Sequence, residues 1–133
     1  MREIKFRGKS DLFGWVYGFY TIIDGSCHIF EEKDLTEDGH HIRQESDRPT
    51  WVDPNTVGQY TGLKDANGKE IYEGDIVACG FFVYRVVYND KGFASFGLLR
   101  KGDMYMHYFE EAMKANECEV IGNIHDNQEL IEK

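Results

Sequence analysis

The sequence lacks a long hydrophobic run. Its longest apolar stretch lies near Phe81–Tyr84 and is far too short to span a bilayer. The first residues, MREIKFRGK, alternate charged and apolar side chains and lack the apolar core of a signal peptide. These absences predict a protein of the cytoplasm with no membrane association.

Cysteine is scarce, and the usual spacings of metal ligands are absent. Cys27, Cys79 and Cys118 are odd in number and widely spaced, without a CxxC pair, which predicts free thiols in a reducing compartment. The neighbouring pairs Cys27-His28 and His40-His41 would point to opposite sides of a strand and chelate poorly. The remaining histidines, His107 and His125, add no ligand spacing. We therefore predict neither a metal site nor a cofactor.

Catalytic and ligand-binding signatures are also missing. The chain has no GxSxG nucleophile motif and no GxxxxGK[ST] phosphate loop. The segment Asp65-Ala66-Asn67-Gly68 has its glycine at the fourth position, whereas a calcium-binding EF-hand loop needs it at the sixth. We predict a protein that is not an enzyme.

A polar cluster near the C-terminus, formed by His125, Asp126 and Asn127, has two interpretations. In an enzyme, His125 could be a base oriented by Asp75 or Asp126. The alternative is a turn in which Asp126 or Asn127 caps a short C-terminal helical turn. The lack of any nucleophile motif favours the turn.

Positive charge is in short supply. The net charge is −9 and the pI is about 4.9, whereas nucleic-acid affinity comes mostly from Lys and Arg that neutralise phosphates. Nucleic acid is therefore not the expected partner. A single-stranded nucleic-acid module remains the alternative only if the scattered basic residues converge on one face: Arg2, Lys5, Arg7, Lys9, Lys64 and Lys69.

Aromatic residues, in contrast, are abundant: nine Phe, eight Tyr and two Trp among 133 residues. They favour β-structure. Strands are expected near 4–7, at 14–23, from Cys27 after an Asp24-Gly25 turn, and within 75–80, 81–90, 92–100 and 119–124. A turn begins at Asp53-Pro54 and another at 89–92, and a helix is expected from about residue 106 to 115.

The pattern predicts a mainly β fold with short helices, of the α+β class. Residues 1–60 would form an N-terminal β-meander with an acidic flap at 31–50. Residues 61–133 would hold a motif hairpin, an SH3-like small β-barrel within 73–125 and a C-terminal helical turn.

The polar segment VGQYTGLKDANGKEIYEGDIV at 57–77 is best explained by turns. Asn67-Gly68 is a strong hairpin signal because both residues tolerate positive φ. Asp65 can accept a hydrogen bond from the backbone two residues on, and Gly74-Asp75 forms a second tight turn.

This segment, together with REIKFRGK, GWVYG and VIGNIHDNQEL, resembles the YopX family of phage and prophage proteins over nearly the whole chain. Residues 24–50 match no family pattern, and Gln128 stands where the family usually has proline. The characteristic positions are occupied by Gly62, Asp65, Gly68, Ile71, Tyr72, Gly74 and Asp75, with Asn67 in the same turn.

The resemblance implies a phage or prophage origin, the bacterial cytoplasm, an SH3-like C-terminal part and homo-oligomers, and it implies no activity. We therefore expect an accessory protein that binds itself or a host or phage protein. Aromatic side chains at an interface, or the acidic flap docking a basic partner, would serve this role.

Overall fold

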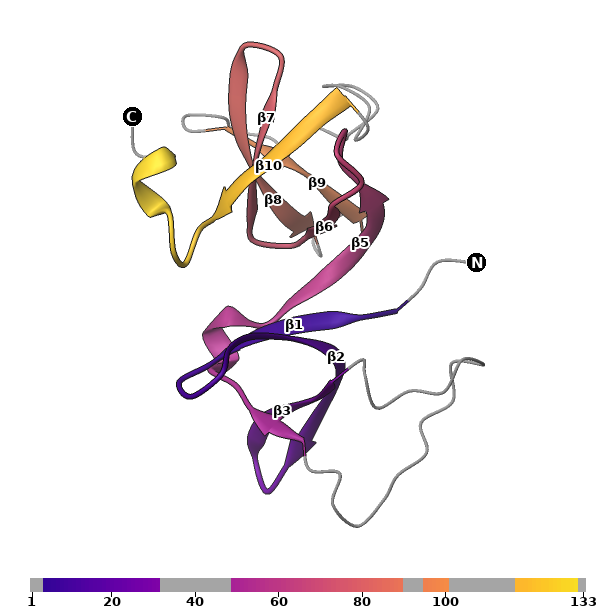
Figure 1. Ribbon diagram of the computed structural model, residues 1–133, viewed down its shortest axis with the longest axis vertical. Coiled ribbons are helices and arrows are strands. Elements are labelled where there is room, and N and C mark those ends of the chain that lie inside the picture. The colour runs from indigo at the N-terminus through magenta and orange to yellow at the C-terminus, as the bar shows by residue number, and fades with distance from the viewer. Residues whose placement is uncertain (1–3, 32–48, 90–94, 101–116, 132–133) are drawn as a thin grey trace. The chain divides into compact units, whose positions relative to one another are not determined.

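The computed structural model describes residues 4–31, 49–89, 95–100 and 117–131. In these residues the chain forms antiparallel strands and two 3-10 turns, so the expectation of a mainly β fold is confirmed (Figure 1). Nearly all of the acidic flap, the turn at 89–92 and the helix expected from residue 106 lie outside the described residues. None of the described segments is a helix long and apolar enough to cross a membrane.

The chain divides into two compact units, residues 1–59 and 60–133, which are called unit 1 and unit 2 below. Strand β5 (Gly58–Lys64) runs across the boundary. Its first residues pair with unit 1, where Gly58 lies opposite Arg7. Its later residues pair within unit 2, where Lys64 lies opposite Glu70.

Unit 1 is a meander of β1 (Phe6–Ser10), β2 (Gly14–Ile23), β3 (Ser26–Glu31) and β4 (Thr50–Trp51), which lie side by side in the order β4-β3-β2-β1. The β2–β3 hairpin turns through Asp24 and Gly25, at φ of 51° and 81°. Both residues therefore adopt the left-handed conformation that a two-residue hairpin turn of this kind requires.

The core of unit 1 consists of Val16, Ile29 and Val52, which are 0 to 5% exposed. Phe6 lies on the core face as expected, opposite Gly18, but exposure does not follow charge, because Ile4 is 61% exposed while Lys5 and Arg7 are each 5% exposed. The Arg7 guanidinium lies 4.7 Å from the centre of the Trp15 ring. A long basic side chain can be covered along its stem in this way, so a charged residue can occupy a shielded position.

Unit 2 contains β6 (Glu70–Tyr72), β7 (Asp75–Cys79), β8 (Phe82–Asn89), β9 (Ser95–Leu99) and β10 (Cys118–Asn123). The last four form a sheet in the order β10-β7-β8-β9, so the final strand returns to pair with β7 (Figure 1). The described strands form no closed barrel. Alternate residues of β8 supply the core, since Tyr84 and Val86 are buried with Ile71, Val77 and Leu98.

The prediction of three free thiols is wrong for two of them. Cys79 and Cys118 form a disulfide, and Cys27 is free. The reason is the strand register, which places Cys118 of β10 directly opposite Cys79 of β7 with 4.5 Å between their Cα atoms. Disulfide-bonded residues usually have Cα atoms 4.4–6.8 Å apart.

Gly18 offers a test of the β2–β3 packing in unit 1. A Cβ atom at this position would overlap the backbone carbonyl oxygen of Phe30. We expect Gly18→Ala to destabilise unit 1 by about 2 to 3 kcal/mol, because the backbone must shift to admit the methyl group. Both tryptophans, Trp15 and Trp51, lie in unit 1, so denaturant unfolding followed by tryptophan fluorescence reports on this unit.

Gly14→Ala is the matched control, because a Cβ at Gly14 meets nothing within 4 Å and the position has a φ of +70°. Only the backbone conformation opposes this change, at a cost of about 1 kcal/mol. Equal midpoints for the two variants would contradict the packing argument.

Candidate functional site

Asp65 organises the turn that joins β5 to β6. Its Oδ1 atom accepts hydrogen bonds from the backbone N–H groups of Asn67 at 2.9 Å and Lys69 at 2.8 Å. The Gly68 N–H donates to the Asp65 carbonyl, and Gly68 has a φ of 80°. Asn67 is not at positive φ, contrary to expectation. The turn is therefore an Asx-type turn with one glycine in the left-handed region rather than a two-residue hairpin.

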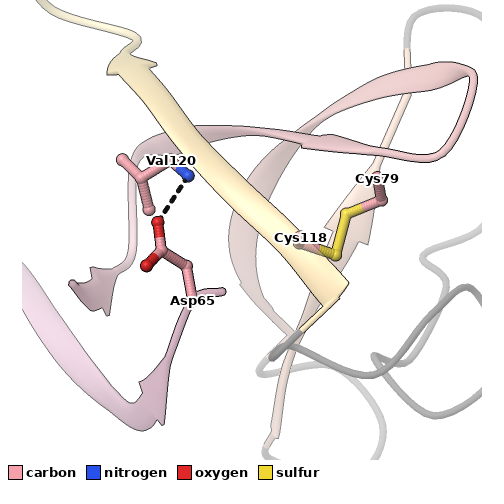
Figure 2. Close-up of a disulfide and its surroundings, with 4 residues drawn as sticks. All are labelled: Asp65, Cys79, Cys118 and Val120. Carbon is pink, nitrogen blue, oxygen red and sulfur yellow. Dashed lines mark hydrogen bonds between the residues drawn. A yellow bond between two sulfur atoms is a disulfide. The ribbon is translucent and has the colours of Figure 1, made fainter. Parts of the chain in front are cut away.

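The same carboxylate also binds the last strand of unit 2. Oδ2 of Asp65 accepts a hydrogen bond of 2.9 Å from the Val120 N–H in β10, 55 positions away (Figure 2). Beside it, the Ala66 N–H donates to the Cys118 carbonyl at 2.8 Å. The Asp65 turn therefore binds the edge of β10 that does not pair with β7.

Electrostatics favour the ionised form of Asp65, which is 5% exposed. Burial alone would raise its pKa. Hydrogen bonds from the backbone N–H groups of Val120, Lys69 and Asn67 and attraction to the Lys69 ammonium outweigh burial, and the pKa lies below its ordinary value of 3.8. Three donors occupy an anion that only accepts, so the carboxylate is committed to binding backbone amides.

Asp75 closes the β6–β7 turn. Its Oδ2 atom accepts a hydrogen bond of 2.7 Å from the Tyr72 N–H, and the residue is 2% exposed. Gly74 has a φ of 92°, donates its N–H to Val86 and accepts at its carbonyl from Ile124. Gly74 thus joins the β6–β7 turn to β8 and to the residue after β10, at a point where only glycine adopts the backbone conformation easily.

The remaining motif residues also lie inside the fold of unit 2. Gly62 has a φ of 87° and lies where the register between β5 and β6 shifts, as in a β-bulge. Ile71 and Tyr72 are 0% and 2% exposed. Sequence reasoning missed Thr61, whose buried hydroxyl donates to the Ile71 carbonyl at 2.8 Å. Threonine is a common strand residue, so the sequence held no signal for this role.

The polar cluster near the C-terminus forms a turn through backbone hydrogen bonds. Oδ1 of Asn123 accepts from the N–H groups of His125 at 3.0 Å and Asp126 at 2.9 Å. Asn127 precedes the 3-10 turn Gln128–Leu130 without a side-chain cap, and its Oδ1 instead accepts from the Asn123 N–H at 3.2 Å. The side-chain cap expected of Asn127 is therefore not found, and Asn123 is the organising residue that the sequence analysis missed.

Gly122 makes this turn possible. A Cβ at Gly122 would lie 2.5 Å from Oδ1 of Asn127, so only glycine leaves room for that side chain. Among the described residues there is no group of three or more His, Cys, Asp or Glu side chains that could hold a metal ion.

One face of the unit 1 sheet carries exposed apolar side chains. Alternate residues of β2 share a face, and the register places Trp51 opposite His28, which lies opposite Thr21 of β2. This face, called the aromatic face below, therefore includes Tyr17, Phe19, Ile23 and Trp51, which are 39%, 39%, 38% and 44% exposed. None of the described strand residues on this face is acidic.

These features define a β protein of two units in which the polar motif residues hold the fold of unit 2 and the aromatic face lies on unit 1. The model of the YopX protein family matches residues 14–132, and the chain belongs to the YopX family. The protein EF1440 from Enterococcus faecalis, whose crystal structure is solved, is 20% identical with a TM-score of 0.52 over 99% of this chain and 100% of that chain. That likeness shows a shared fold. No curated protein matches the chain.

Asp65→Asn tests the role of this carboxylate in unit 2. An amide has only one acceptor oxygen and directs an NH2 group at one of the present backbone donors. We expect a loss of about 2 kcal/mol in the stability of unit 2, because at least one buried N–H loses its partner. Amide hydrogen exchange at Val120, measured by NMR, checks it. Glu119→Gln, an exposed acid on β10, is the control that removes the same charge and leaves exchange unchanged.

The lowered pKa of Asp65 predicts an acid-dependent stability. Because the folded pKa lies below the unfolded value of about 3.9, the ionised group stabilises the fold fully above that pH. This contribution disappears as the pH falls through the folded pKa. Unit 2 of the wild type should lose protection at Val120 below about pH 4, whereas Asp65→Asn should lack this component. Parallel pH profiles would contradict the assignment.

Proposed function

We propose that this chain is a phage- or prophage-encoded accessory protein of the bacterial cytoplasm that acts by binding protein, either a second copy of itself or a host or phage protein, and not by catalysis. The aromatic face of unit 1 is the observation that carries this proposal. Membership of the YopX family supports the phage origin by resemblance. An SH3-like barrel in residues 73–125 stays a prediction.

The composition of the aromatic face fits protein binding. Exposed apolar side chains normally occur singly on a surface, whereas neighbouring ones mark interaction sites. Tyr and Trp are also frequent anchors of interfaces, because each buries a large area and retains a polar atom that can bind at the rim. Phe19 and Trp51 come from β2 and β4 and therefore present a broad surface rather than a single protruding residue.

The motif residues support a role outside catalysis. Asp65 and Asp75 are buried and bind backbone N–H groups. Groups committed to the fold in this way are poorly placed to exchange protons with a substrate.

A single-stranded nucleic-acid module is the second candidate, and one observation favours it. On the aromatic face the Arg7 guanidinium lies 4.7 Å and the Lys9 ammonium 6.0 Å from the Trp15 ring centre. Stacking of bases on aromatic rings beside cations is how such modules bind. The net charge of −9 and the burial of Arg7 place this candidate second.

Phe19→Thr and Trp51→Thr test the proposed protein interface. Both changes keep a β-forming residue at a strand position and remove apolar area. Phe81→Thr is the matched control, because Phe81 is an exposed phenylalanine of unit 2. We expect wild type and control to self-associate or to retain a stoichiometric partner from nuclease-treated host lysate, and the two interface variants to lose at least about tenfold in affinity.

Light scattering over a concentration series distinguishes self-association from capture of another protein. Variants that associate as the wild type does would overturn the aromatic face as the interface. A salt-sensitive complex with an oligothymidine, weakened by Lys9→Gln, would instead establish the nucleic-acid candidate.

A further inference from the structure

The disulfide between Cys79 and Cys118 attaches the first residue of β10 to β7. The two cysteines face each other across β7 and β10, at Cα atoms 4.5 Å apart. We propose that this pair is a reversible redox latch on β10, closed by thiol–disulfide exchange with a small-molecule disulfide such as oxidised glutathione and opened by a dithiol reductant. The proposal concerns unit 2 and is independent of the proposed function.

The strand register allows both redox states in the same fold. Residues directly opposite in an antiparallel pair have Cα atoms about 4.5–5.5 Å apart, so the sulfurs meet without displacement of either backbone. Both residues belong to the apolar core of unit 2 and are 2% and 0% exposed. A reduced cysteine behaves as a small apolar side chain and is compatible with that core.

The bond acts on a strand at the end of the strand order of its sheet. In the order β10-β7-β8-β9, β10 is an outer strand, and Cys118 is its first residue. Hydrogen bonds also attach the start of β10 to its neighbours. They include the Val120 N–H bond to Asp65 (Figure 2), the ladder to β7 and the Ala66 N–H bond to the Cys118 carbonyl. In the dithiol form these hydrogen bonds must hold the start of β10 without the covalent link.

The exchange takes place in two steps. The thiolate of one cysteine attacks the small disulfide, forms a mixed disulfide and releases one thiolate. The thiolate of the other cysteine then attacks the protein sulfur of the mixed disulfide and releases the second. Two electrons pass to the small disulfide, and the two protons lost by the cysteines are taken up by the two released thiolates.

Burial couples this chemistry to motion of the strand. A reagent reaches the sulfurs only when the start of β10 separates from β7, which is a local opening rather than unfolding of the whole unit. Reducing surroundings favour the dithiol form, and a rise in oxidised small thiols favours the disulfide form. The free energy needed to open β10 therefore depends on the redox state of the surroundings.

A Cys27→Ser protein tests the latch, because only Cys79 and Cys118 then remain. It is equilibrated in buffers of reduced and oxidised glutathione, alkylated and analysed by mass. Amide exchange is then measured by NMR in each form. We expect an intramolecular disulfide in the oxidising buffers and at least about tenfold faster exchange at Val120 and Ile124 in the dithiol form, with unit 1 unchanged.

Equal exchange in the two forms would overturn the proposal, as would a lasting mixed disulfide or the absence of any disulfide in the most oxidising buffer. The triple variant Cys27→Ser/Cys79→Ser/Cys118→Ser is the control for reagent effects, and it should exchange at Val120 like the dithiol form whatever the buffer. A dependence of its exchange on glutathione would also count against the latch.

Asp65→Asn provides a second, independent test in the Cys27→Ser background. If the disulfide and the carboxylate hold the same strand, the variant should accelerate exchange at Val120 more in the dithiol form than in the disulfide form. If the variant folds only in the disulfide form, this also supports the latch, because the disulfide then compensates for the lost carboxylate. Equal acceleration in both forms would count against the latch, because the disulfide would then not restrain the strand that Asp65 holds.

Discussion

The hydrogen bond between the Asp65 carboxylate and the Val120 N–H is the interaction on which unit 2 depends most. It joins residues 55 positions apart in the sequence and fixes the last strand to the first hairpin of the unit. A buried carboxylate is costly unless donors replace its water, and here three backbone N–H groups do so. The Asx-type turn orients this carboxylate, and the positive φ of Gly68 completes that turn. The conformation of the Asp65 turn and the contact between Asp65 and Val120 therefore depend on each other.

The two attachments of β10 respond to different conditions. The Asp65 bonds weaken when the carboxylate is protonated, because an uncharged acid is a poorer acceptor for backbone amides. The Cys79–Cys118 bond is indifferent to acid and sensitive to thiols. Because Val120 and Cys118 lie on the same short strand, either attachment alone limits how far that strand can open. Removing both leaves the Ala66 N–H bond to the Cys118 carbonyl and the ladder to β7, which is interrupted between Val120 and Gly122.

The local elements could be predicted from the sequence, but the long-range contacts could not. The strand at 14–23 and the Asp24-Gly25 turn follow from neighbouring residues, and the structure has both. The disulfide depends on β10 pairing with β7, which no residue near Cys118 signals. The burial of Arg7 depends on Trp15 in the next strand, so charge alternation along β1 indicated the core face correctly but not the covering of Arg7 on the opposite face. The Asx turn at Asp65 was predictable, but its bond to Val120 was not.

The characteristic positions of the YopX family within the segment 57–77 lie inside unit 2 and hold its fold. Gly62, Gly68 and Gly74 adopt positive φ, Ile71 and Tyr72 are buried, and Asp65 and Asp75 bind backbone amides. A motif composed of such residues specifies a backbone, because each of them satisfies a requirement of chain geometry or of buried polar groups. The binding proposed for this chain is therefore assigned to side chains outside the motif. The aromatic face of unit 1 is a surface of that kind, since Phe19 and Trp51 are exposed and play no part in the core of their unit.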